Sequence, residues 1–122
     1  MSILVFLEHH GDELQKGSLG VLAKAASLGD ADAVIVGGGV SALAAEAGKY
    51  GAKKVHVADD ASLDPPLPQP RVDVIAKIAG GYEAVLFANS VLAADVAAGL
   101  AARLDAGLNW DLVDLTSDFV GK

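Results

Sequence analysis

Two hydrophobic patterns alternate along this chain of 122 residues. Short continuous apolar runs, such as Ile3–Leu7, are typical of strands that are covered on both faces. The intervening segments carry apolar residues at helical spacing instead. We therefore expect strands at Ile3–Leu7, 33–38, Lys54–Ala58, Glu83–Ala88 and 111–119, and helices at 18–28, 41–50, 72–79 and 91–107.

The ends of the predicted helices are marked by small and polar residues. Ser18 is placed to cap the first helix, and Gly29 and Gly51 are placed to end the first and second helices. The fourth helix has Asn89 or Ser90 as a possible cap. Its apolar arc consists of Leu92, Val96, Leu100 and Leu104, flanked by Ala93, Ala97 and Ala101. Residues 8–17 are expected to form a polar loop. Residues 59–71 hold all four prolines and are expected to form an extended loop.

Strands joined by crossover helices run parallel, and such crossovers are right-handed. The pattern therefore predicts a three-layer α/β/α sandwich with a mainly parallel sheet of about five strands in the order 3-2-1-4-5. We expect residues 1–122 to form a single α/β domain. The fifth strand is followed by no closing helix, which leaves open whether the chain is complete or a fragment of a longer protein; the family resemblance described below implies the N-terminal part of a longer subunit.

Composition narrows the possible functions. The chain has no cysteine, which excludes thiolate catalysis and zinc–thiolate sites, and its net charge of −7 opposes nucleic-acid binding. No apolar run approaches the length of a membrane span. The first residues lack the basic segment of a signal peptide, so we expect a cytoplasmic protein without membrane insertion.

The segment Val34–Ala42, VIVGGGVSA, fits the dinucleotide fingerprint through Gly37, Gly39 and Ala42, with Asp59 and Asp60 about twenty residues later. It is either a phosphate-binding loop or a tight turn from a strand into a helix. We favour the turn, because the fingerprint normally follows the first strand and this loop follows the second. In the expected strand order the ligand crevice lies next to the first strand.

Two further loops face the expected crevice. His9, His10, Asp12 and Glu13 have side chains that could bind a metal, but they lack a recognised ligand spacing, so we favour a solvated loop. Ser90 lacks the surroundings of a nucleophile, so we favour helix capping for it.

The remaining candidates have structural explanations. His56 alternates with valines and is expected to pack against a helix, Lys53 and Lys54 to be solvated, and Arg103 to suit a helix C-terminus. Trp110 is expected to pack at the sheet edge or to anchor an interface. The residues alone thus predict no catalytic, cofactor-binding or metal site.

Three segments, 3–29, 34–60 and 81–115, together resemble the N-terminal domain of the electron transfer flavoprotein alpha subunit. The first segment has a strand, Glu8, a polar turn and a helix that ends in Leu-Gly. The second has a small-residue turn, an Ala-rich helix and a YGA motif followed by KV and acids. The third has a strand followed by a long helix. The sequences GGGVSA and ANSVLAADV depart from the family's usual loops after the second and fourth strands, which leaves open a divergent paralogue with another partner.

The resemblance implies a nucleotide-binding-like fold of the adenine nucleotide alpha hydrolase type. It implies an electron carrier rather than an enzyme, with a beta subunit as partner and with FAD held mainly by a C-terminal domain beyond Lys122. The full complex would take electrons from dehydrogenases and pass them to a quinone reductase or similar acceptor. Two alternatives remain: a stand-alone nucleotide-binding module of the universal-stress-protein type, and a dinucleotide-dependent enzyme using Gly37, Gly39 and Asp59.

Overall fold

The computed structural model describes residues 2–10, 13–63, 67–79, 82, 84–88 and 91–104. Its main sheet consists of β1 (Ser2–Phe6), β4 (Asp30–Gly37), β5 (Val55–Asp59) and β6 (Ala84–Phe87). The α-helices are α1 (Lys16–Leu28), α2 (Ala44–Lys49), α3 (Pro68–Ala79) and α4 (Val91–Leu104). Short 3₁₀ turns η1 (Ser41–Leu43) and η2 (Ala61–Leu63) and a small hairpin of β2 (His9–His10) and β3 (Glu13–Leu14) complete the described elements.

The main sheet has the order β5-β4-β1-β6, and all three pairings are parallel. This confirms the mixed α/β fold and the 3-2-1-4 part of the predicted order. The register places Phe6 opposite Val34 and Phe87, so the carboxyl ends of neighbouring strands lie together. The predicted fifth strand, 111–119, lies outside the described residues.

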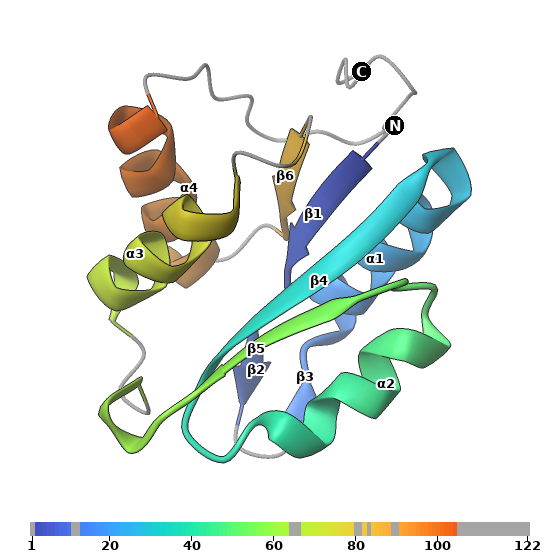
Figure 1. Cartoon of the computed structure of the whole chain (residues 1–122), viewed down its shortest axis with the longest axis horizontal. Coiled ribbons are helices and arrows are strands. Elements are labelled where there is room, and N and C mark those ends of the chain that lie inside the picture. Colours follow the sequence, from blue (N-terminus) through green and yellow to red (C-terminus); the bar gives the residue numbers. More distant parts are fainter. Residues whose placement is uncertain are drawn as a thin grey trace.

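Helices cover both faces of this sheet, with α1 and α2 on one side and α3 and α4 on the other (Figure 1). Alternate residues of the strands serve the two cores, because successive side chains of a strand point to opposite faces. Ile3, Val5 and Ile35 pack toward α1 and α2, whereas Leu4 and Val34 pack toward α3 and α4. Since β1 and β4 are buried on both faces, they are the continuous apolar runs seen in the sequence.

The first polar segment is more ordered than predicted. Instead of a loop over residues 8–17, β2 and β3 form an antiparallel hairpin closed by a bond from the Gln15 amide to the Glu8 carbonyl (2.9 Å). Helix α1 then begins at Lys16, two residues earlier than expected. The Ser18 hydroxyl is buried inside the helix and accepts a hydrogen bond from the Glu8 amide (3.0 Å), so the prediction of a Ser18 cap is wrong.

The proline-rich segment is also more helical than predicted. Helix α3 begins at Pro68, so Pro68 and Pro70 lie in its first turn and not in an extended loop. Proline is tolerated there because the first amides of a helix have no partner within the helix. Residues 64–66 lie outside the described part of the chain.

Most other boundaries agree with the sequence pattern. Helix α1 ends just before Gly29, the segment from Ser41 begins as a 3₁₀ turn that continues into α2, and Gly51 follows α2 with a positive φ of 107°. In α4, Val96 and Leu100 of the predicted arc are buried together with the flanking Ala93 and Ala97, and Leu92 is partly buried against the same core, whereas the Leu104 side chain lies outside what the structure describes. None of the described helices is long and apolar enough to span a bilayer.

Candidate functional site

The candidate side chains meet at the carboxyl edge of the sheet. Glu8 and His9 come after β1. Gly37 ends β4 and is followed by Gly38 and Gly39, and Asp59 ends β5. In open α/β sheets this is the edge at which ligands bind, in the crevice where the strand order reverses. Here the order reverses beside β1, between β1 and β6, and the glycines lie one strand further away, as predicted.

The glycine segment is held by a carboxylate of the same chain. Asp59 accepts hydrogen bonds from the amide of Gly39 (2.7 Å), the amide of Ser41 (3.1 Å) and the Ser41 hydroxyl (2.5 Å). These are the donors that a phosphate bound at this loop would use. The acid about twenty residues after the glycines, which the fingerprint assigns to a ribose, thus binds the loop itself.

These hydrogen bonds also favour the ionised form of the Asp59 carboxyl group. The Ser41 hydroxyl, and then the amides of Gly39 and Ser41, lower the pKa of the Asp59 carboxyl because they stabilise its ionised form. Asp60 does not share this role, since it accepts a hydrogen bond from the Ser62 amide (2.9 Å) at the start of η2. The two adjacent acids therefore stabilise different turns.

At two of the three glycine positions, the backbone conformation or a close contact explains why a side chain is disfavoured. Gly39 has a φ of 69°, a left-handed conformation that disfavours other residues. A Cβ on Gly37 would lie 2.5 Å from Nε2 of His9, closer than real contacts allow. The glycines thus permit a turn and a close side-chain approach.

His9 is directed at the sheet. Its Nε2 lies 3.1 Å from the carbonyl oxygen of Val36, so this nitrogen carries the proton and donates it. Glu13 is exposed on β3, while the His10 side chain and Asp12 lie outside what the structure describes. Among the described residues, no three His, Cys, Asp or Glu side chains are grouped so that they could hold a metal ion.

Sequence reasoning missed Arg71, which is only 3% exposed. Its guanidinium donates to the carbonyl oxygens of Leu67 (3.1 Å), Leu63 (3.2 Å) and Val36 (3.3 Å). Burial lowers the pKa of Arg71, and the charge of Glu8 opposes this shift. Arg71 therefore connects α3 and the preceding segment to the end of β4. Arg71 falls at the end of the predicted proline-rich loop, so no local pattern indicated its burial.

A second polar group that was missed lies on the α3 and α4 face of the sheet. The Tyr82 hydroxyl donates to Oδ2 of Asp32 (2.5 Å), and Nε2 of His56 lies 2.7 Å from the same hydroxyl. Burial and the Asp32 carboxylate raise the pKa of Tyr82 to about 12. The rings of His56 and Tyr82 also meet edge to face, with centroids 6.1 Å apart. His56 is thus partly buried and takes part in a hydrogen-bond network with Tyr82 and Asp32, while its packing against a helix stays a prediction.

Lys53 was expected to be solvated, and it is exposed, but its Nζ also bonds Oδ1 of Asp30 at 2.5 Å. The Lys54 amide donates to Asp32 while its side chain is exposed. The predictions for Ser90, the Arg103 side chain and Trp110 fall outside the described residues.

Comparison with known proteins decides the family. The model of the electron transfer flavoprotein domain matches residues 3–121. The chain belongs to the electron transfer flavoprotein family. Its relatives include electron transfer flavoprotein alpha subunits of Mycobacterium tuberculosis, 36% identical over 98% of this chain, and of Mycobacterium leprae, 38% identical over 97%. The alpha subunit of Pseudomonas aeruginosa is 32% identical over 96% of this chain.

The resemblance to alpha subunits is therefore confirmed. The chain covers 39%, 38% and 38% of these three relatives, so it corresponds to only about two fifths of an electron transfer flavoprotein alpha subunit.

Proposed function

We propose that this chain is the N-terminal scaffold and partner-binding domain of an electron transfer flavoprotein alpha subunit. Together with a beta subunit, the complete alpha subunit carries FAD. The complex shuttles electrons from dehydrogenases to a respiratory acceptor such as a quinone reductase. The family match over residues 3–121 and the alpha-subunit relatives support this role.

The observation that carries the scaffold role is the contact between Asp59 and the glycine turn. The amides of Gly39 and Ser41 already bind a carboxylate, so the loop offers these two donors to no phosphate. We therefore propose that the domain contains no catalytic, cofactor-binding or metal residues of its own. FAD is held mainly by a C-terminal part of the subunit, and the domain acts as a cytoplasmic electron-carrier component.

The test compares the full-length subunit, co-expressed with its beta subunit, with residues 1–122 alone. We expect flavin absorption bands from the purified complex and none from the shorter polypeptide. Equilibrium dialysis of the shorter polypeptide with ATP, AMP and NADH serves as the second measurement. Tight nucleotide binding, or a complex that purifies without flavin, would contradict the proposal.

A further inference from the structure

Positive charge is concentrated on one face of an otherwise acidic molecule. Helix α1, helix α2 and the segment leading to β5 carry five lysines and one acid, Glu46. The rest of the chain carries fifteen acids and only four basic residues. We call this region the lysine face; its lysines are Lys16, Lys24, Lys49, Lys53 and Lys54.

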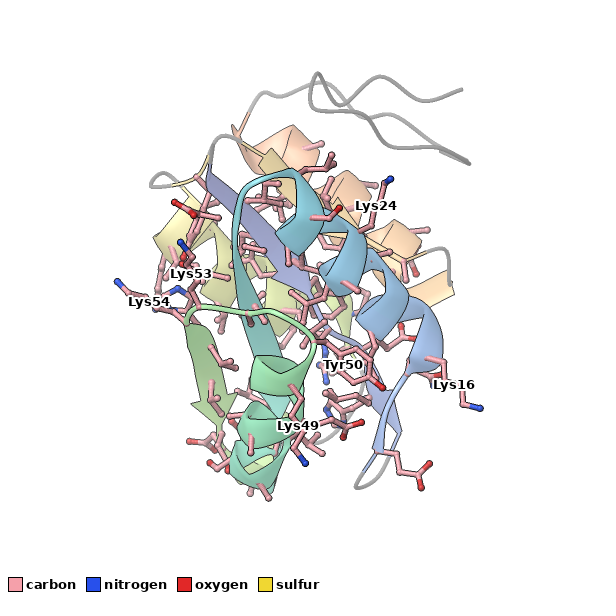
Figure 2. All side chains as sticks on the ribbon, turned by 90° about the vertical axis from the view of Figure 1, so that its right-hand side faces the viewer. Lys16, Lys24, Lys49, Tyr50, Lys53 and Lys54 are labelled. Atoms are coloured by element: carbon pink, nitrogen blue, oxygen red, sulfur yellow. The ribbon has the colours of Figure 1, made fainter. Side chains whose placement is uncertain are left out.

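All five lysines of this face are exposed. Lys53 is bound by Asp30, whereas within the described residues the other four have no carboxylate within ion-pair distance. Figure 2 shows their side chains extending outward from α1, from the end of α2 and from the segment before β5. The four ammonium groups without a carboxylate are therefore available to negative charges on another molecule.

Tyr50 lies in the middle of the lysine face in this view (Figure 2). Its side chain is 43% exposed, which is unusual for one of only six aromatic residues in the chain. The backbone around it is fixed, because the Tyr50 amide bonds the Ala47 carbonyl (3.1 Å) and Gly51 turns the chain with φ 107°. A partly exposed tyrosine with lysines around it matches the aromatic centre and polar rim of a protein–protein contact.

We infer that the lysine face docks an acidic protein surface, with Tyr50 as its central contact. Charge complementarity supports this occupant, because the face is positive while the rest of the molecule is negative. The lysines are also distributed over two helices around an aromatic side chain, which suits a protein surface better than a phosphate backbone.

The experiment uses the full-length subunit in its complex and a fluorescent polyglutamate peptide as the acidic probe. We compare the wild type with K16E/K49E/K54E, with the milder K16Q/K49Q/K54Q and with Tyr50→Ser. Lys77→Glu is the matched control, because Lys77 is an exposed lysine on α3, on the other side of the sheet. Fluorescence anisotropy is recorded at low and at high salt, and thermal melting confirms that each variant folds.

Binding by the wild type should weaken as salt is added, since the contact is electrostatic. The charge-reversed variant should lose about tenfold or more in affinity, the glutamine variant less, and Lys77→Glu almost nothing. Tyr50→Ser should weaken binding at both salt concentrations. Retained flavin absorption in these variants separates this inference from the proposed function, because the lysine face is inferred from exposed lysines and Tyr50 and does not depend on flavin binding.

Three results would overturn the inference. One is equal polyglutamate binding by the wild type and the charge-reversed variant. Another is an equal loss of binding in Lys77→Glu. The third is tighter binding of phosphatidylserine vesicles or duplex DNA than of polyglutamate, which would assign the face to a lipid or nucleic-acid ligand.

Discussion

At the scale of single residues, Asp59 joins the end of β5 to a turn that lies 18 to 20 residues earlier. In Asp59→Asn, an NH2 group would replace one of the two acceptor oxygens and so oppose a donor of either Gly39 or Ser41. We expect a lower free energy of unfolding at neutral pH, measured by guanidinium denaturation.

The effect of Asp59→Asn should depend on pH. The folded-state pKa of Asp59 is lowered, so its stabilisation is fully present above the unfolded value of about 3.9 and is lost as the pH falls through the folded value. The difference between wild type and variant should therefore shrink below about pH 4. Asp95→Asn, at an exposed position on α4, is the control and should show little difference at either pH. A difference between wild type and Asp59→Asn that stays constant down to pH 3 would contradict this account.

Tyr82 offers a direct spectroscopic prediction. The chain has two tyrosines, so Tyr50→Phe leaves Tyr82 as the only phenol. Its ultraviolet titration should have a midpoint near 12, because burial and Asp32 disfavour the phenolate. This folded-state pKa is raised, so the stabilisation is present below the unfolded value of about 10 and is lost as the pH rises through about 12.

A matched control for this titration removes the carboxylate that Tyr82 contacts. In Tyr50→Phe combined with Asp32→Asn, the midpoint of Tyr82 should move down toward its ordinary value. Circular dichroism at each pH verifies that the protein is folded. A midpoint near 10 with Asp32 intact would show that the Tyr82–Asp32 contact is not formed in solution.

Individual side-chain roles were the hardest features to predict from sequence. The glycine segment was correctly placed at a strand-to-helix turn, yet its partner Asp59 was interpreted only through the fingerprint. Arg71 and Tyr82 were missed because their partners, Val36 and Asp32, are respectively 35 and 50 residues away in sequence. Neither periodicity nor local motifs contain information on contacts at such separations.

At the scale of elements, two glycines at the end of α2 give a paired prediction. A Cβ on Gly51 would lie 2.6 Å from the Cβ of Ala26 in α1, and its φ is 107°. Gly51→Ala should therefore lower the free energy of unfolding by about 2 to 4 kcal/mol, through backbone strain and overpacking between the helices.

Gly48→Ala is the matched control, because Gly48 lies within α2, three residues before Gly51. A Cβ there would meet nothing within 4 Å, so the substitution should stabilise the helix by about 0.5 to 1 kcal/mol. Urea denaturation of both variants measures the contrast. If both substitutions changed stability equally, the described contact of α2 with α1 would be wrong.

The ends of helices and strands were predictable where the boundary residue had only one structural role. Gly29 and Gly51 end or follow their helices as expected. The start of α3 was missed because proline was interpreted as a breaker, although its first-turn position avoids the lost hydrogen bond. The start of α1 was missed because Ser18 satisfies the Glu8 amide of the preceding turn instead of an amide of its own helix.

At the scale of the whole molecule, the order of the described strands followed from the alternation of patterns. Crossover connections permit few topologies, and the doubly buried strands β1 and β4 had to be central. The distribution of charge over the faces was not predictable in the same way. It requires knowing that α1 and α2 cover one face together, which emerges only from the folded arrangement (Figure 1).

The hydrogen bonds between Asp59 and the glycine turn affect how a sequence-motif search for dinucleotide-binding enzymes should be interpreted. A search for two glycines, a small residue and a later acid would select this chain as a dinucleotide enzyme, although the acid closes onto the very amides that the search assumes to be vacant. The hits of such a search are better separated by checking in a structure whether the acid's carboxylate is bound by amides of the glycine loop itself. Here Asp59 ends the strand that pairs with the glycine strand, and its carboxylate reaches back to the amides of Gly39 and Ser41.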